Sequence, residues 1–268
     1  MLEKGEIVEA IKRLGLAGRV VCAHSSYRSF GKVKGGPETI VQSYLDAGCT
    51  LVVPTFSYEF EAGVRRDYQQ NGWNEPLTET TGTTAPKEYS SMGLEIDKGM
   101  GAISNCLVRM PRRIRGEHPI DSFTAMGPSA KEVISPQTPM DIYGPLRKLT
   151  ALDGAIVLMG VGLDSMTFIH FAELGAGRNL FRRWGHYKDQ GAIETQVGGC
   201  SDGFPRLERA VAHLKTEATV GKSLWKVFPA RKTLEALVQA IRLDPGITHC
   251  ERTDCERCND AVKGGPIV

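Results

Sequence analysis

The sequence lacks the long apolar run of a membrane protein and the charge excess of a nucleic-acid-binding protein. No stretch approaches the roughly 18 to 20 apolar residues of a membrane span. The 33 basic side chains are nearly balanced by 31 acidic ones, so the net charge is only +2 and no overall field draws the protein to nucleic acid or to an anionic membrane. We therefore expect neither partner, and any charge selectivity must be local. The sequence carries no indication of oligomeric state.

Disulfide and export signals are also scarce. The seven cysteines are odd in number and scattered except for three near the end, which fits a reducing cytoplasm better than a disulfide framework. Residues 1–15 predict an amphipathic helix, with Ile7, Ile11 and Leu14 on one face, rather than an apolar signal segment. We expect a cytoplasmic protein.

Three common catalytic signatures are missing as well. Residues 21–40 contain neither the G-x-x-x-x-G-K-[ST] spacing of a Walker loop nor the G-x-G-x-x-G spacing of a dinucleotide fold. The segment AHSSY at residues 23–27 lacks the G-x-S-x-G elbow, which disfavours a serine hydrolase. Any ligand site in this region must be recognised from its own residues.

The sequence does contain the alternation of strands and helices that is typical of an α/β protein. Short apolar runs bounded by Gly, Pro or Ser predict strands at residues 19–25, 49–57 and 154–162. A helix is predicted between the first two, at residues 37–48, with a proline in its first turn and a glycine at its end. Strand, helix and strand in succession form the unit of a layered α/β fold.

One long segment breaks this pattern. Residues 58–100 have little periodic apolar pattern and are rich in Gly, Thr, Asn, Glu and Gln. An insert of this length is typical of a functional loop, and we expect it on the substrate side; the alternative is a mobile surface excursion. Because no repeat or linker interrupts the chain, we expect a single domain over residues 1–268.

The segment between the first predicted strand and the first predicted helix is rich in small donors, glycines and cations. Hydroxyl and backbone N–H donors, glycines that permit close approach, and a helix N-terminus would all face one space. We interpret the segment as a site for an extended anionic ligand; the alternative is a polar loop with solvated cations. The residues concerned are Ser25, Ser26, Arg28, Ser29, Gly31, Lys32, Lys34, Gly35 and Gly36.

A second group of residues indicates acid–base chemistry. In the helix predicted after the strand at 154–162, Thr167, His170 and Glu173 recur every third residue and so share one face. A carboxylate at that distance can orient an imidazole, and such a histidine suits a general base. The alternative is a core histidine with satisfied hydrogen bonds. The threonine and glutamate on the same face favour the general base.

The C-terminal segment, residues 248–260, is rich in cysteine and histidine. The C-x-x-C pair Cys255 and Cys258, beside His249, is a credible half of a tetrahedral zinc site. His249 and Cys250 are adjacent, so both need not reach one metal, and either is open as a ligand. We choose Cys200 as the remote fourth ligand. The alternative is a set of reduced surface thiols without metal.

The chain resembles the aminoglycoside 3-N-acetyltransferase family, the antibiotic N-acetyltransferases unrelated to the GNAT fold. The resemblance rests on an ordered set of segments: HSSYRSFGKVKGG, TLVVPTFS, EHPIDSFTAMGP, YGPLRKL, LDGAIVLMGVGLDSMTFIHFAE and, more weakly, VGKSLWKVFPARKTLEALV. It covers about residues 19–240 and implies a three-layer α/β sandwich, with a central mixed β-sheet flanked by helices.

The resemblance also implies roles for the residues above. Acetyl-CoA would be the donor, with its pantetheine and pyrophosphate in the loop of hydroxyls and glycines. His170, in a T-x-x-H-x-x-E pattern, would deprotonate the acceptor amine for direct attack on the thioester, Glu173 would orient the imidazole, and Thr167 would lie near the thioester. The residues assigned to CoA are His24, Ser25, Ser26, Tyr27, Arg28, Ser29, Gly31, Gly35, Gly36, Ser122 and Phe123.

The acceptor implied by the resemblance is a small-molecule amine, an aminoglycoside acetylated at its 3-N position. A polycationic acceptor needs a carboxylate-lined pocket. Glu59 and Glu61, Asp164 and Asp202 flank predicted strand ends, and of these we choose Glu59, Asp164 and Asp202; a solvated loop is the alternative for the two glutamates. An acyltransferase for a different amine is the alternative function. A zinc-stabilised nucleic-acid-binding module is disfavoured, because the basic run at 109–116 has no interleaved aromatic residues.

Overall fold

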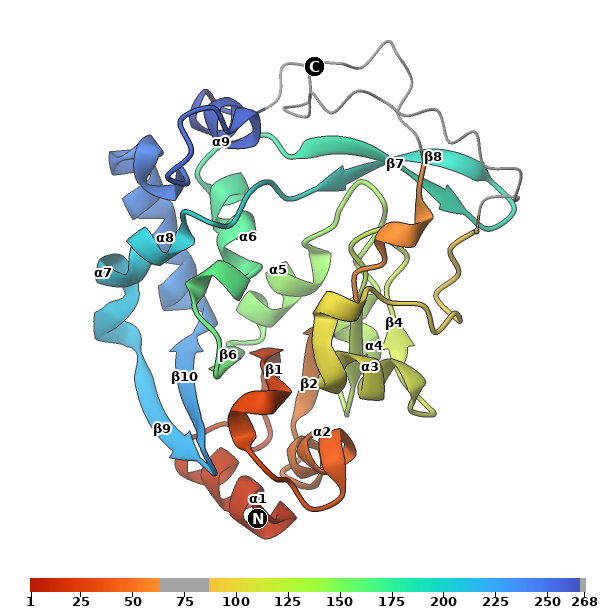
Figure 1. Cartoon of the computed structure of the whole chain (residues 1–268), viewed down its shortest axis with the longest axis vertical. Coiled ribbons are helices and arrows are strands. Elements are labelled where there is room, and N and C mark those ends of the chain that lie inside the picture. Colours follow the sequence, from red (N-terminus) through yellow and green to blue (C-terminus); the bar gives the residue numbers. More distant parts are fainter. Residues whose placement is uncertain (63–86, 266–268) are drawn as a thin grey trace.

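A seven-stranded mixed sheet forms the centre of the molecule (Figure 1). The computed structural model describes residues 1–62 and 87–265. β1 pairs in parallel with β2 and β6, and the other neighbouring strands are antiparallel. The three strands predicted from the sequence are therefore present and form the parallel centre of the sheet. The strand order is β4 (Ile114–Arg115), β5 (Phe123–Met126), β2 (Thr50–Pro54), β1 (Val20–Ser25), β6 (Ala155–Met159), β10 (Ser223–Pro229) and β9 (Thr216–Val220).

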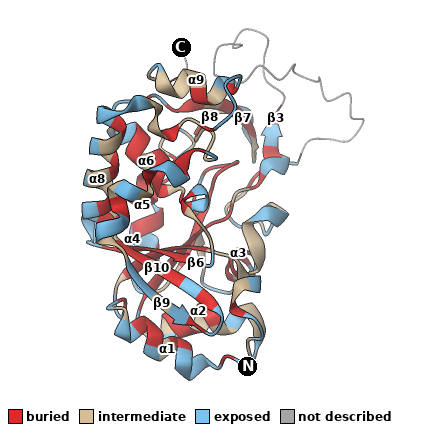
Figure 2. Cartoon of the chain, turned by 60° about the vertical axis from the view of Figure 1, so that its left-hand side comes forward, coloured by how far each residue is buried: buried red, intermediate tan, exposed pale blue. Residues whose placement is uncertain are grey.

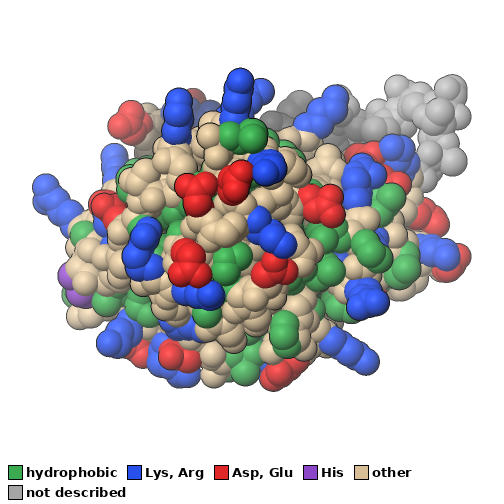
Figure 3. Space-filling view, turned by 90° about the horizontal axis from the view of Figure 1, so that it is seen from below, with side chains coloured by type: hydrophobic (Ala, Val, Ile, Leu, Met, Phe, Trp, Pro, Cys, Tyr) green, Lys and Arg blue, Asp and Glu red, His purple; other side chains and the backbone are tan. Residues whose placement is uncertain are grey.

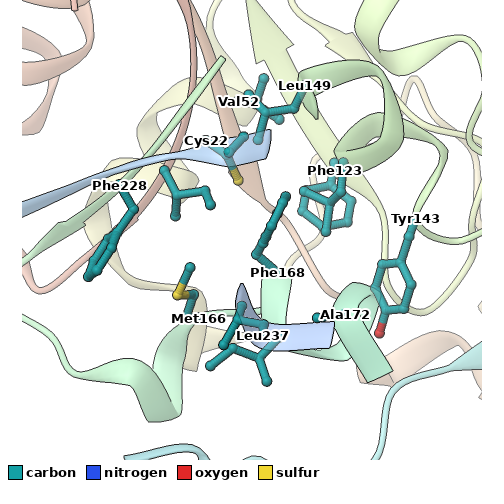
Figure 4. Packing of buried hydrophobic residues seen from close by; sticks show 14 of the residues in the cluster. Cys22, Val52, Phe123, Tyr143, Leu149, Met166, Phe168, Ala172, Phe228 and Leu237 are labelled. Carbon is teal, nitrogen blue, oxygen red and sulfur yellow. The ribbon is translucent and has the colours of Figure 1, made fainter. Parts of the chain in front are cut away.

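Helices cover both faces of this sheet, because alternate strand residues point to opposite sides. Val21 and Ala23 of β1 belong to one core cluster, which also includes residues of α1 (Lys4–Arg13), α2 (Gly36–Asp46) and α3 (Gly101–Arg109). Val20 and Cys22 belong to the opposite cluster, part of which is drawn in Figure 4. The helices on that side are α4 (Ala130–Ile134), α5 (Gly144–Ala151), α6 (Phe168–Gly175), α7 (Glu208–Val211) and α8 (Ala230–Leu243).

Burial follows this layering. Buried residues concentrate in the sheet and on the inner faces of the helices, whereas the outer helix faces are exposed (Figure 2). At the end of the molecule that carries α1 and α2, acidic and basic side chains are interspersed on the surface (Figure 3). The expected three-layer sandwich with a central mixed sheet is confirmed.

The local sequence explains where α2 begins and ends. Pro37 lies in its first turn, where the missing N–H is not needed for a helical hydrogen bond. Gly35 before the helix has a φ of 79° and Gly48 after it has a φ of 74°, a left-handed conformation that glycine adopts without steric cost. The helix predicted at residues 37–48 is thus confirmed, shifted by one or two residues at its ends.

A second, smaller sheet lies apart from the first and was not predicted. It joins β3 (Glu61–Ala62), β7 (Phe181–Tyr187) and β8 (Gly191–Val197), all antiparallel, in the order β3-β7-β8. In Figure 1 β7 and β8 cross the top of the molecule near α9 (Glu256–Val262). The helices of the described segments are all too short or too polar to span a membrane.

Parts of the predicted insert are built into this smaller sheet. β3 comes from the insert, and Tyr89 forms a bridge to Tyr187 of β7, with its N–H donating to the His186 carbonyl at 2.8 Å. Tyr89 is fully buried, so this part of the insert is not a surface excursion. The remainder of the insert, residues 63–86, lies outside the described residues.

Candidate active site

A cavity of about 490 Å³ opens at the carboxyl end of β1 and reaches the smaller sheet. Segments far apart in the sequence supply its walls. They include the end of β1, the start of α3, the turn before β5, the start of α6 and the end of β8. Its titratable lining side chains are His24, Tyr58, Glu61, Asp121, Tyr143, Asp164, His170, Arg183 and Arg257.

His170 lies in this cavity wall, on the first turn of α6. Its Nδ1 is 2.8 Å from Oε2 of Glu173, and the other carboxylate oxygen, Oε1, accepts a hydrogen bond from Arg178 at 2.5 Å. Arg178 also donates to the Thr248 hydroxyl at 2.7 Å. The guanidinium is thereby held in place, and it fixes the carboxylate oxygen that does not contact His170. Because a carboxylate only accepts, Nδ1 carries the proton and Nε2 is the basic nitrogen. The predicted pairing of His170 and Glu173 is present.

The surroundings of the imidazole restrict its movement. The ring of Phe204 lies 4.7 Å from the His170 ring, centroid to centroid, at a steep angle. A Cβ atom on Gly198 would lie 2.8 Å from Cδ2 of His170 and 2.7 Å from the Tyr143 hydroxyl, so only glycine fits there. Thr167 lines the cavity at the N-terminus of α6, and its carbonyl accepts a hydrogen bond from the His170 N–H at 3.0 Å.

The structure places only some of the residues predicted for CoA in the cavity lining. His24 and Ser25 line the cavity, whereas Ser26, Tyr27, Arg28, Ser29 and the three glycines lie beyond its lining. Ser29 closes the loop onto the sheet, because its hydroxyl donates to the Ser26 carbonyl at 2.6 Å and to Ser223 at 2.7 Å. Gly35 instead borders a separate groove beside α1.

Ser122 and Phe123 need a correction, because the structure brings neither to the cavity lining. Both side chains are fully buried. Ser122 donates to the Thr55 carbonyl at 2.9 Å and accepts from Arg115 at 3.0 Å, while Phe123 stacks edge-on against Phe56 inside the core. Internal partners therefore account for both residues.

Of the carboxylates predicted for the acceptor, likewise, only some line the cavity. Asp164 lines the cavity, but Glu59 lies outside the lining in an exposed ion pair with Lys87, and Asp202 is likewise outside it. Glu61, which we noted but did not choose, does line the cavity. The sequence analysis missed Asp121, although an acidic residue two positions before the buried strand β5 was a signal for it.

Four thiols form a compact cluster next to the cavity. The Sγ atoms of Cys200, Cys250, Cys255 and Cys258 all lie within 4.8 Å of one another. His249 is not part of the cluster, because its Nδ1 meets the Cys250 carbonyl at 2.6 Å and its Nε2 meets Asn259 at 3.0 Å. The structure thus replaces His249 with Cys250. The Cys258 thiol hydrogen-bonds to Cys200 and lowers the pKa of the Cys200 thiol.

Comparisons with known proteins agree with this geometry. A family model described as aminoglycoside 3-N-acetyltransferase matches residues 22–242. The aminoglycoside N(3)-acetyltransferase VIII of Streptomyces fradiae is 30% identical over 178 residues, which is 65% of this chain and 61% of that protein. The enzyme IV of Salmonella sp is 31% identical over 180 residues, 65% of this chain and 59% of that protein. The chain thus matches about three fifths of each relative's length.

Solved structures share the fold. The apoenzyme of the aminoglycoside acetyltransferase AAC(3)-IVa superposes with a TM-score of 0.77 at 24% identity, covering 98% of this chain and 97% of that one. The YokD protein from Bacillus subtilis superposes with a TM-score of 0.73 at 23% identity, covering 90% and 99%. Since the family model spans most of the sequence, the chain belongs to the aminoglycoside 3-N-acetyltransferase family.

Proposed function

We propose that the protein is an acetyl-CoA-dependent N-acetyltransferase that acetylates an amino group of an aminoglycoside, at the 3-N position. The observation that carries this proposal is the chain His170, Glu173 and Arg178 at the wall of a cavity that also holds carboxylates. Family membership supports it, and a related acetyltransferase has been solved with a gentamicin and with apramycin.

The proposed chemistry begins with a proton transfer to His170. Its Nε2 accepts a proton from the acceptor amine as the amine nitrogen attacks the thioester carbonyl of acetyl-CoA. An N–C bond forms, the C–S bond breaks, and the CoA thiolate leaves and takes the proton from the imidazolium. Glu173 holds Nδ1–H and stabilises the transient positive charge on the ring, while Arg178 keeps the carboxylate in place.

The donor would enter at the carboxyl end of β1. His24 and Ser25 line the cavity there, and Thr167 lines it near His170. The exposed part of the loop, with Arg28, would then meet the phosphates outside the cavity. Burial lowers the pKa of His24 to about 4, so this imidazole is neutral at pH 7 and contributes hydrogen bonds rather than charge.

A thiol-release assay tests the proposed function. Purified protein is mixed with acetyl-CoA and a panel of amines that includes gentamicin, apramycin and simple monoamines, and free CoA thiol is measured. We expect release with aminoglycosides and a product whose mass rises by one acetyl group. Release with another amine but with no aminoglycoside would overturn the proposed acceptor and favour the alternative acyltransferase.

We also propose a structural zinc ion in the thiol cluster. A tetrahedral zinc thiolate site, with Zn–S bonds of about 2.3 Å, places its sulfur atoms about 3.8 Å apart. The four Sγ atoms of the cluster fit that arrangement, and the Cys250 N–H already donates to Cys258 Sγ at 3.4 Å. Four protein ligands would leave no open position, so the ion would hold α9 to the segment after β8 and would not activate water.

A further inference from the structure

Tyr143 has a buried side chain whose hydroxyl lacks a partner within the described residues. The residue is only 1% exposed, yet it lines the cavity, and its phenol oxygen makes no hydrogen bond to any described group. In Figure 4 its ring lies at the edge of the labelled cluster. Buried hydroxyl groups almost always have a hydrogen-bond partner. The missing partner is therefore expected to come from a molecule that enters the cavity.

The hydroxyl lies close to the proposed base. A Cβ atom on Gly198 would lie 2.7 Å from the Tyr143 hydroxyl and 2.8 Å from Cδ2 of His170, so the phenol oxygen and the imidazole border the same small space. Cδ2 is the ring atom bonded to Nε2, the nitrogen that would accept the proton of the amine. The phenol oxygen and Nε2 are therefore near enough to contact neighbouring atoms of one reacting centre.

The position of Tyr143 is held by its surroundings. Its carbonyl accepts from the Arg147 N–H at 2.9 Å at the start of α5, and its ring lies 6.2 Å from the Phe171 ring, centroid to centroid. A Cβ atom on Gly144 would lie 2.5 Å from the Pro136 carbonyl oxygen, so this turn is closely packed. Burial raises the pKa of the phenol well above its ordinary value, so it is a neutral donor at pH 7. A donor fixed in this way needs no reorganisation during a reaction.

We propose that the Tyr143 hydroxyl donates a hydrogen bond to the carbonyl oxygen of the thioester, and to the oxyanion that this oxygen becomes when the amine attacks. This inference rests on the proposed function. As the N–C bond forms, the π electrons of the carbonyl move onto its oxygen, and they return when the C–S bond breaks, so the phenol keeps its proton throughout. The attacking nitrogen and the oxyanion are bonded to one carbon, so hydrogen bonds of about 2.7 to 3.0 Å let His170 contact the first and Tyr143 the second.

Other donors line the same cavity and define the alternatives. Thr167 lies at the N-terminus of α6, and Arg183 of β7 and Arg257 of α9 also contribute to the lining. Arg183 Nε lies 3.6 Å from Glu61, so part of its charge is balanced there. Tyr143 is favoured because its oxygen borders the imidazole and has no partner within the described residues.

The first test compares Tyr143→Phe with wild type in steady-state acetylation of gentamicin. We expect kcat to fall about 10²- to 10³-fold, the usual effect of removing one oxyanion donor, while KM for acetyl-CoA changes little. The melting temperature should not fall, because the hydroxyl has no partner to lose among the described residues. A kcat near that of wild type, or a loss of kcat that accompanies a lower melting temperature, would overturn the inference.

The matched control for this test is Tyr44→Phe, which also removes one buried hydroxyl. Tyr44 lies in α2 outside the cavity lining, and its hydroxyl meets the Met159 sulfur at 3.5 Å. We expect its kcat to equal that of wild type. An equal loss of kcat in both variants would mean that the effect does not arise at the reacting centre, and would count against the inference.

The second test observes the hydrogen bond without acetyl transfer. Acetyl-CoA that is isotope-labelled at the thioester carbonyl is bound in the absence of amine, and the carbonyl stretching frequency is measured by difference infrared spectroscopy. The frequency should be lower in wild type than in Tyr143→Phe, because a hydrogen bond weakens the C=O bond. Equal frequencies in the two proteins would overturn the inference. So would a frequency that rises in Thr167→Val but not in Tyr143→Phe, since the threonine would then be the donor.

The two tests separate this inference from the proposed function. A carbonyl frequency that depends on Tyr143, in a protein that acetylates no aminoglycoside, would support the inference and overturn the proposed function. Acetylation of gentamicin with equal kcat in wild type and Tyr143→Phe would do the reverse. A protein that neither binds acetyl-CoA nor acetylates gentamicin would overturn both.

Discussion

Two carboxyl groups beside one cavity have opposite surroundings. Both oxygens of Glu173 have partners within the chain, His170 on one side and Arg178 on the other. Asp121 is about as deeply buried, yet its Oδ1 has no partner among the described residues. Satisfied hydrogen bonds fix a group in one orientation, while unused capacity in a buried group indicates a ligand. The comparison supports our proposal that Glu173 orients His170, and it leaves Oδ1 of Asp121 open to a ligand in the cavity.

The largest expected effect comes from removing the group that Glu173 orients. His170→Ala should lower kcat by about 10²- to 10⁴-fold, the usual contribution of a general base, while acetyl-CoA affinity changes little. Turnover under saturating substrates and calorimetry with CoA measure the two quantities. The matched control is His213→Ala, at an exposed position outside the cavity lining. Near-normal turnover in His170→Ala would show that another group is the base.

The next effect is smaller, because it leaves the base in place. Glu173→Gln should reduce kcat by about 10- to 100-fold and lower the free energy of unfolding by about 1 to 3 kcal/mol, since Arg178 loses its charged partner. Adding Glu173→Gln to His170→Ala should cost no further rate, because the two residues act as a unit. Fully additive rate losses would mean that Glu173 acts independently of the imidazole.

A change in the cavity wall tests the geometry without removing a functional group. Gly198→Ala would place a methyl group against His170 and Tyr143, so the imidazole must move and kcat should fall about tenfold. Gly5→Ala is the control, because a Cβ there meets nothing within 4 Å. If both variants turn over at the wild-type rate, the imidazole has more freedom than the contacts indicate.

The smallest effect on chemistry is expected at the thiol cluster. Purified protein should contain about one zinc ion per chain, and Cys255→Ser should release it and lower the melting temperature, because metal binding contributes folding energy. The loss of rate should follow the loss of folded protein. Cys106→Ser, in α3 and outside the cluster, is the control. Protein prepared without chelators that contains no zinc would contradict the proposed ion.

The sequence predicted those features that depend on local spacing. His170 and Glu173 are three residues apart on one helix, so their contact follows from helical geometry once α6 is recognised. The three strands β1, β2 and β6 were likewise predicted from short apolar runs, but their parallel pairing was not. Ser122 and Phe123, by contrast, lie in a matching segment but face the core, a direction that the segment alone does not reveal.

Features built from distant segments were harder to predict. Asp121, Glu61 and Arg183 come together because β3 and β7 pair in a small sheet whose strands have little apolar alternation. The choice between His249 and Cys250 depended on which of two adjacent side chains turns inward, and a hydrogen bond to Asn259 holds the histidine away from the thiols. The spacing of residues in the sequence does not show which of these two side chains faces the other thiols.

The short segment after β8 restricts which insertions and deletions this protein can accept during evolution. Gly198 lies against the imidazole, and two residues later Cys200 belongs to the thiol cluster. An inserted or deleted residue there would displace the base or pull a sulfur atom out of the cluster. Substitutions at Glu61 and Asp121 affect neither the position of His170 nor the thiol cluster. We therefore expect substitutions to accumulate at Glu61 and Asp121, on the side of the cavity where the proposed acceptor would bind, while the segment from Gly198 to Cys200 stays the same.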